Sequence, residues 1–230
     1  MTMILVHGGG FAASCWDRMM PYVDADTRAI DLPGRGAHPA PLANLTTIDF
    51  VDAVVDEIVS NDLTDVLLVG HSLAGITLPG VAARIPGRLR RLVFIACTVP
   101  AEGTSVFDSL PPDVQAAAEE TSGPDEATLQ AEMAEVVFCN DMDDELTAWT
   151  LSHMVPEAMQ VAYEPVDLSG LRQPVPRTWV RLLRDVIVTP EKQDQMVRNM
   201  GGAEVVELDA AHMAMISYPK ELAEILNNLA

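Results

Sequence analysis

Short runs of apolar and β-branched residues recur along this chain, and longer segments with an apolar residue every three or four positions lie between them. The runs predict strands at Met3–Val6, Arg28–Asp31, Val66–Val69, Leu92–Ala96, Thr178–Leu182 and Val205–Leu208. The longer segments predict helices at Trp16–Val23, Thr47–Asn61, Leu73–Arg84, Pro190–Met200 and Pro219–Leu229. This alternation is typical of an α/β fold with a mostly parallel central sheet and helices on both faces.

The predicted helix over residues 47–61 carries the helical repeat clearly. Its apolar residues at this spacing are Ile48, Val51, Val55, Ile58 and Val59. We expect these side chains to lie near one face of the helix.

Residues 100–170 break the alternation. They contain no convincing strand, and their helical pieces are rich in Ala, Glu and Met and are separated by prolines. We expect a helical cap over this range, inserted into a core formed by residues 1–99 and 171–230. Insertions of this length usually lie over a functional face.

Composition narrows the class of protein. The 230 residues suit one domain with an insertion. The net charge of −20, from 34 acidic and 14 basic residues, argues against binding to nucleic acid or to an anionic membrane. Three cysteines without metal-ligand spacing indicate reduced thiols in a cytoplasmic protein and no metal site. The sequence leaves open whether the protein forms a homodimer. The densest acidic cluster, Asp141, Asp143, Asp144 and Glu145, lacks the pattern of a calcium loop and is expected to be a solvated helix start.

The segment from Val66 to Gly75 carries the strongest chemical signal. An apolar strand runs into Ser72, and the small residues Gly70, Ala74 and Gly75 surround it. Small residues permit the sharp, strained turn that exposes a nucleophilic serine between a strand and a helix. On this motif alone, the alternative is a buried strand followed by a turn in which Ser72 only caps a helix.

A nucleophilic serine needs a base, and His212 is the best placed of the five histidines. It follows the strand predicted over residues 205–208, at the edge where open α/β sheets build their sites. His71 adjoins the serine, so its side chain is expected to point elsewhere. Asp185 follows the preceding predicted strand and is the candidate acid that orients the imidazole. Asp209 and Glu207 are rivals, but they lie too close to His212 along the chain to reach it easily.

A glycine-rich loop, His7-Gly8-Gly9-Gly10, follows the first predicted strand. Its backbone N–H groups can approach a substrate oxygen, and the amides of Gly9 and Leu73 are the predicted oxyanion hole. A phosphate-binding loop is the alternative. It is weak because the spacing is not that of a dinucleotide fingerprint and no Lys-Ser/Thr follows.

With these residues in place, the chain resembles the α/β-hydrolases. The segments that carry the resemblance are Val6–Gly9, Asp31–Gly36, Gly70–Gly75, Arg184–Asp185 with Pro190, and Ala211–Met215. They span nearly the whole chain, and the resemblance is closest to the plant methylesterase and hydroxynitrile lyase branch with its bacterial relatives. It implies the α/β-hydrolase fold, no cofactor, a catalytic triad of Ser72, Asp185 and His212, and an oxyanion hole at Gly9 and Leu73.

Two positions separate the reactions of that branch. Hydroxynitrile lyases carry threonine where Gly8 stands and lysine where Met213 stands, and neither residue present here can hold a cyanohydrin hydroxyl or attract departing cyanide. The resemblance therefore implies a serine hydrolase that cleaves a carboxylic ester or lactone. Met, Phe and Trp residues in the predicted cap favour a small to medium apolar substrate. A carbon–carbon lyase and a non-catalytic small-molecule binding protein on the same fold are the alternatives.

Overall fold

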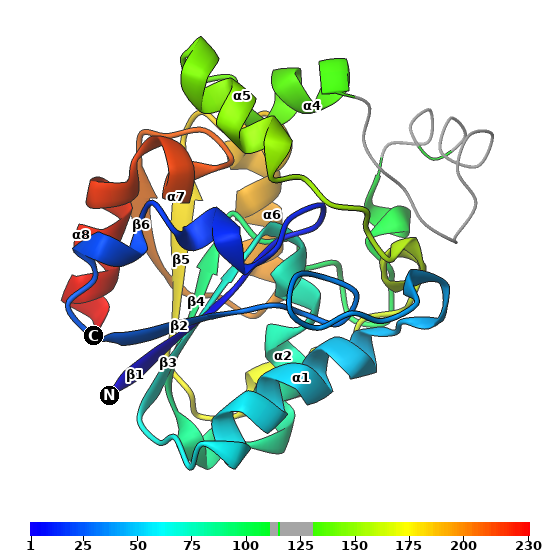
Figure 1. The fold of residues 1–230 in the computed structure, drawn as a ribbon. Coiled ribbons are helices and arrows are strands. Elements are labelled where there is room, and N and C mark those ends of the chain that lie inside the picture. Colours follow the sequence, from blue (N-terminus) through cyan, green and yellow to red (C-terminus); the bar gives the residue numbers. More distant parts are fainter. Residues whose placement is uncertain (111–114, 116–130) are drawn as a thin grey trace.

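The computed structural model describes residues 1–110, 115 and 131–230, and its centre is a single parallel sheet (Figure 1). The strand order is β2-β1-β3-β4-β5-β6, and every neighbouring pair is parallel. The strands are β1 Thr2–Val6, β2 Asp26–Ile30, β3 Val66–His71, β4 Leu89–Ile95, β5 Arg177–Leu182 and β6 Glu204–Leu208. The predicted α/β fold is confirmed, and the predicted strands are all present with ends shifted by a few residues.

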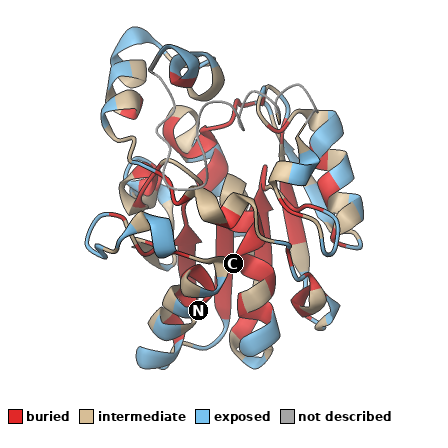
Figure 2. Ribbon diagram, turned by 90° about the vertical axis from the view of Figure 1, so that its right-hand side faces the viewer, coloured by how far each residue is buried: buried red, intermediate tan, exposed pale blue. Residues whose placement is uncertain are grey.

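Helices cover both faces of the sheet. Within the described residues they are α1 Thr47–Ser60, α2 Leu78–Arg84, α4 Ala131–Phe138, α5 Asp144–Ser152, α6 Pro190–Asn199, α7 Ala214–Ser217 and α8 Pro219–Leu229. Successive strand residues point to opposite faces. Ile4 and Val6 of β1 therefore pack with α1, α2 and α6, whereas Met3 and Leu5 pack with α7 and α8. Figure 2 shows the buried strands between helices whose outer faces are exposed.

Helix α1 begins with a reciprocal cap between Thr46 and Asp49 and buries one narrow face. The buried residues are Phe50, Val51, Val54 and Ile58. The predicted face is wrong at two positions, because Ile48 is 62% exposed and Val59 is 43% exposed. At about 100° per residue, both lie roughly 100° or more around the helix from the centre of the buried stripe.

Two predicted helices are shortened by prolines. The helix expected over residues 16–23 is replaced by 3-10 turns at Ala13–Trp16 and Met20–Tyr22, and Pro21 lies in the second turn. The helix expected over residues 73–84 is a 3-10 turn at Ser72–Ile76 followed by α2, whose second residue is Pro79. Proline lacks the N–H that would continue an α-helix, which explains both breaks.

The described residues between β4 and β5 form helices and turns without a strand, as expected for a cap. Figure 1 places α4 and α5 beyond the carboxyl ends of the strands, and part of the predicted cap, 111–114 and 116–130, lies outside the described residues. Asp143 caps α5 by accepting the Leu146 amide at 2.9 Å, so the acidic cluster does begin a helix. Asp141 departs from the prediction, because its side chain is only 1% exposed.

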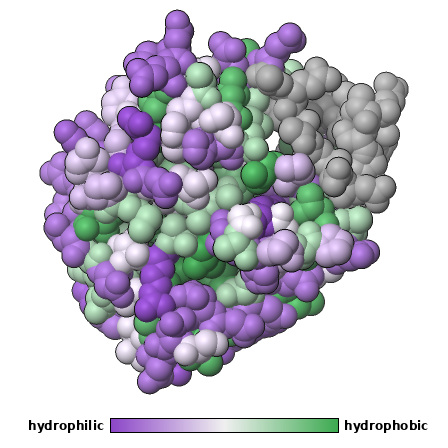
Figure 3. Space-filling view, viewed as in Figure 1, coloured by the Kyte–Doolittle hydropathy of each residue, from purple (hydrophilic) through white to green (hydrophobic). Residues whose placement is uncertain are grey.

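On the face shown in Figure 3, hydrophobic residues gather in the middle and hydrophilic residues line the edge.

Candidate active site

Ser72 sits on a strained turn at the carboxyl end of β3. Its φ is +50°, in the left-handed region that residues with a Cβ rarely adopt. Close contacts disfavour a side chain at Gly70 and exclude one at Gly75 unless the backbone moves. A Cβ on Gly70 would lie 2.7 Å from Leu78 Cδ1, and a Cβ on Gly75 would lie 2.3 Å from the Thr98 carbonyl oxygen. Strain that close packing maintains is typical of functional positions.

The tertiary structure brings Ser72, His212 and Asp185 together from three strand ends. Ser72 Oγ lies 2.9 Å from His212 Nε2, and His212 Nδ1 lies 2.6 Å from Asp185 Oδ2. The amides of Ile187 and Val188 donate to Asp185 Oδ1 at 2.8 and 2.9 Å, so both carboxylate oxygens are held. His212 and Asp185 are buried. This arrangement can move a proton from Ser72 to the imidazole and stabilise the imidazolium that results.

The two rival carboxylates are engaged by arginines at the surface. Asp209 lies 3.0 Å from Arg184 Nε, and Glu207 lies 3.3 Å from Arg181. Their side chains are 77% and 57% exposed. The carboxylate at the imidazole is therefore Asp185.

The side chain of His71 is directed toward the backbone of the candidate base. Its Nε2 donates to the backbone carbonyl oxygen of His212 at 2.9 Å, and the two rings lie 4.6 Å apart. Burial, with the neighbouring His212 as a second cause, holds the pKa of His71 well below its usual 6.5. His71 is therefore a neutral hydrogen-bond donor to the backbone of the candidate base.

The glycine-rich loop lies against the serine turn. A Cβ on Gly8 would lie 2.8 Å from Ser72 Cβ, and a Cβ on Gly9 would lie 3.6 Å from Leu73 Cβ. The predicted oxyanion donors, Gly9 and Leu73, are thus spatial neighbours beside Ser72. Only a residue without a side chain fits at Gly8.

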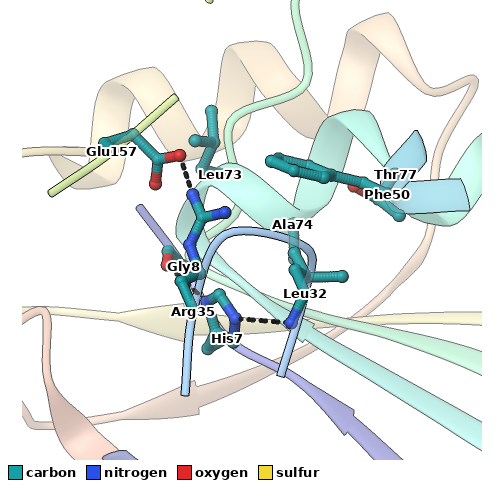
Figure 4. Close-up of a pocket in the computed structure, with 9 residues that line it drawn as sticks. All are labelled: His7, Gly8, Leu32, Arg35, Phe50, Leu73, Ala74, Thr77 and Glu157. Carbon is teal, nitrogen blue, oxygen red and sulfur yellow. Dashed lines mark hydrogen bonds and ion pairs between the residues drawn. The ribbon is translucent and has the colours of Figure 1, made fainter. Parts of the chain in front are cut away.

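Buried polar residues fix the course of this loop (Figure 4). His7 Nδ1 donates to the Gly8 carbonyl oxygen at 2.8 Å, and the Leu32 amide donates to His7 Nε2 at 3.2 Å. Burial, assisted by the charge of Arg35, lowers the pKa of His7 to about 4. The guanidinium of Arg35 is fully buried and forms an ion pair with Glu157, and its own pKa falls to about 10 because of burial.

Glu157 also joins the predicted cap to the glycine-rich loop. The Gly10 amide donates to Glu157 Oε2 at 3.0 Å, and the Val155 amide donates to the Gly10 carbonyl oxygen at 2.9 Å. The sequence indicated no role for Glu157, because 122 positions separate it from Arg35 and no local pattern links them.

A groove of about 520 Å³ opens beside the loop after β5, which carries Asp185 and is called the acid loop below. It is lined by residues from the loop after β4, the loop after β5, and α6, including Thr98, Ile187, Val188 and Met196. The Thr98 amide donates to the Ser72 carbonyl oxygen at 2.9 Å. Thr98 therefore both lines the groove and holds the backbone of the serine turn.

Residues 1–110, 115 and 131–230 hold no group of three or more His, Cys, Asp or Glu side chains arranged for a metal ion. In the described part of the chain, no helix combines the length and apolar character needed to cross a membrane. Cys15, Cys97 and Cys139 are buried free thiols.

Several known proteins are similar to this chain over nearly its whole length. A carbendazim hydrolyzing esterase of Nocardioides is 29% identical, covering 98% of each chain, and Methylesterase 17 of Arabidopsis thaliana is 24% identical over 97% of this chain and 89% of its own. An extracellular α/β-hydrolase from a Paenibacillus species superposes with a TM-score of 0.90 at 24% identity, over 100% of this chain and 99% of its own. The predicted resemblance to plant methylesterases and bacterial relatives is confirmed. These relatives are named as esterases, which agrees with the predicted hydrolysis of carboxylic esters. The model of the Alpha/beta hydrolase family matches residues 3–225, and the chain belongs to that family.

Proposed function

We propose that this protein hydrolyses carboxylic esters through a covalent acyl-enzyme on Ser72. The observation that carries the proposal is the continuous hydrogen-bonded chain from Ser72 Oγ through His212 to Asp185, with distances of 2.9 and 2.6 Å. A hydroxyl is a weak nucleophile until a base removes its proton. Here His212 is that base, and the buried carboxylate of Asp185 stabilises the charged imidazole.

The reaction proceeds in two steps. Ser72 Oγ attacks the carbonyl carbon while His212 Nε2 takes the proton, and the tetrahedral intermediate collapses as His212 protonates the leaving alcohol. Water then attacks the acyl-enzyme, again with His212 as the base, and releases the acid and free Ser72. Asp185 keeps Nδ1 protonated in both steps.

The negative oxygen of each tetrahedral intermediate needs hydrogen-bond donors. We assign this role to the amides of Gly9 and Leu73. The assignment is supported by the close approach of these two residues to each other beside Ser72. One such donor typically lowers the barrier by about 3–4 kcal/mol. Glu157 and Arg35 act indirectly, because they hold the loop that carries Gly9.

The preferred substrate is a small to medium, uncharged and largely apolar ester or lactone. The groove beside the acid loop has Val106, Leu110, Ile187, Val188 and Met196 among its lining residues, which suit an apolar substituent. The net charge of −20 disfavours anionic substrates. Equal turnover of charged and neutral esters would contradict this preference.

Cyanohydrin cleavage is the competing reaction on this fold. It fits poorly, because Gly8 has no room for a threonine side chain and Met213 is buried and uncharged. Release of cyanide from mandelonitrile, at a rate comparable with ester hydrolysis, would favour the lyase over the esterase.

A fluorophosphonate reaction followed by intact-mass analysis tests the proposal directly. The wild type should gain one phosphonyl adduct and hydrolyse p-nitrophenyl acetate, and Ser72→Ala should do neither. Ser105→Ala is the matched control, since Ser105 is a buried serine that bonds Asp108 outside the site. A wild type that is neither labelled nor active on an ester and lactone panel would indicate a non-catalytic binding protein.

Three further expectations remain proposals. The helical cap at 100–170 and the core at 1–99 and 171–230 are distinct units, the protein is cytoplasmic, and two copies can associate as a homodimer. Limited proteolysis, fractionation of the source cells and light scattering test them in turn.

A further inference from the structure

A buried carboxylate outside the proposed triad reaches the loop that carries the base. Asp141 lies in the connection between α4 and α5, and its Oδ2 accepts the backbone amide of Ala211 at 2.7 Å. Ala211 immediately precedes His212 in the chain. The Asp141 side chain is 1% exposed, and its Oδ1 is buried with no hydrogen-bond partner among the residues that the structure describes. Buried polar oxygens usually accept a hydrogen bond, so this position calls for an explanation.

The partners of Asp141 lie on both candidate catalytic loops. Ser217 Oγ at the end of α7 donates to Asp141 Oδ2 at 3.2 Å, and the guanidinium of Arg184 lies 3.6 Å from the same oxygen. Arg184 immediately precedes Asp185. One carboxylate thus contacts the residue before the acid and the residue before the base.

The neighbouring residues of the same connection make matching contacts. Asn140 Nδ2 donates to the carbonyl oxygen of Arg184 at 3.1 Å, and the ring of Phe138 lies 5.9 Å from the ring of His212. We name residues 138–141 the clamp. It touches the acid loop, the base loop and the imidazole, although it belongs to the predicted cap.

The geometry explains why the clamp matters for chemistry. His212 must keep Nε2 at 2.9 Å from Ser72 and Nδ1 at 2.6 Å from Asp185 at the same time. A small rotation of the backbone at Ala211 would lengthen at least one of these contacts. Misplacement of a reacting group by about 1 Å is enough to cost on the order of 100-fold in rate.

We propose that Asp141 is a positioning residue that holds the backbone of the base His212 and thereby couples the cap to the catalytic geometry. The proposal rests on the proposed function of Ser72, Asp185 and His212. The acceptor oxygen is the essential feature, because the Ala211 amide is the contact closest to the base.

The test compares Asp141→Ala, Asp141→Asn and the matched control Asp209→Ala. Asp209 also pairs with Arg184 but is surface-exposed, and within the described residues the Ala211 amide donates to Asp141 and not to Asp209. With p-nitrophenyl acetate, we expect Asp141→Ala to lower kcat about 10- to 100-fold with KM changed by less than about threefold. Asp141→Asn keeps an acceptor for Ala211 and should recover to within about fivefold of wild type, and Asp209→Ala should stay within about twofold.

A spectroscopic readout separates this proposal from the proposed function. The proton between His212 Nδ1 and Asp185 gives a low-field proton NMR signal that does not depend on turnover. We expect Asp141→Ala to shift or broaden this signal while Asp141→Asn and Asp209→Ala retain it. Unchanged kcat and an unchanged signal in Asp141→Ala would overturn the positioning role, and so would an Asn variant as impaired as the Ala variant. If Asp141→Ala does not fold, Asp141→Leu, which fills similar space without an acceptor, is measured in the same two ways, and wild-type kcat with an unchanged signal would overturn the role. A wild type without esterase activity but with a clamp-dependent signal would reject the proposed function alone.

Discussion

His71 Nε2 donates a hydrogen bond to the backbone carbonyl oxygen of His212 at 2.9 Å, so the residue beside the nucleophile supports the residue that activates it. The two histidines come from strand ends 141 positions apart. Because His71 is buried and neutral, this contact adds a directional bond without adding a charge next to the imidazole.

Replacing His71 by Phe should weaken both activity and stability. Phenylalanine fills similar space but leaves the buried carbonyl of His212 unpaired, which costs about 1–3 kcal/mol in the free energy of unfolding. We expect a lower kcat on p-nitrophenyl acetate and a lower midpoint in urea. His38→Phe is the control, because His38 is exposed, and it should change neither. Wild-type kcat in His71→Phe would argue against the supporting role.

Stability should fall as the pH drops from about 6.5 to about 4, in part because of His7. The pKa of His7 is about 4 in the folded protein, against its usual 6.5. Between these values the unfolded chain binds a proton that the folded protein excludes, so the stabilisation is complete above 6.5 and is lost towards 4. At full extent the loss is about 3 kcal/mol.

Urea unfolding at several pH values, in the wild type and in His7→Asn, isolates this contribution. The slope of the free energy of unfolding against pH should be smaller in the variant over this window. Carboxylates contribute equally to both proteins, so identical slopes would mean that His7 is not the titrating group.

A methyl group at Gly75 should disrupt the serine turn. The new Cβ would lie 2.3 Å from the Thr98 carbonyl oxygen, which the backbone relieves only by moving the serine turn or the loop after β4. We expect Gly75→Ala to lower the free energy of unfolding by about 2 kcal/mol or more and to reduce esterase activity. Gly87→Ala is the matched control, because within the described residues no atom other than those of Gly87 and its chain neighbours lies within 4 Å of its Cβ position, and it should be neutral within about 0.5 kcal/mol. Equal melting temperatures for the two variants would contradict the steric argument.

The buried pair of Arg35 and Glu157 should be much more sensitive than a surface pair. Glu157→Leu leaves the Arg35 guanidinium buried without its partner, which typically costs about 3–5 kcal/mol. The double variant with Arg35→Met should be less destabilised than the sum of the single variants. Asp52→Ala breaks the exposed pair with Arg84 and should cost less than about 1 kcal/mol. A double-mutant cycle by chemical denaturation measures all of these, and strict additivity would show that the two side chains act independently.

The sequence alone determined the parallel sheet and the candidate residues Ser72, Asp185 and His212. Strand positions follow from the local apolar pattern, and parallel strands bring their carboxyl ends to one edge, so residues just after strands are predicted to meet there. Local chain signals also explain the breaks at Pro21 and Pro79, because a proline lacks the N–H that an α-helix needs.

Tertiary packing decided what supports those residues. The direction of His71, the buried state of Asp141 and the pairing of Glu157 with Arg35 depend on partners far along the chain. The exposure of Ile48 and Val59 on α1 likewise depends on how the whole helix rests against the sheet. Apolar periodicity reports which residues prefer burial, but a polar side chain becomes buried only where the fold places a hydrogen-bond partner or an opposite charge beside it.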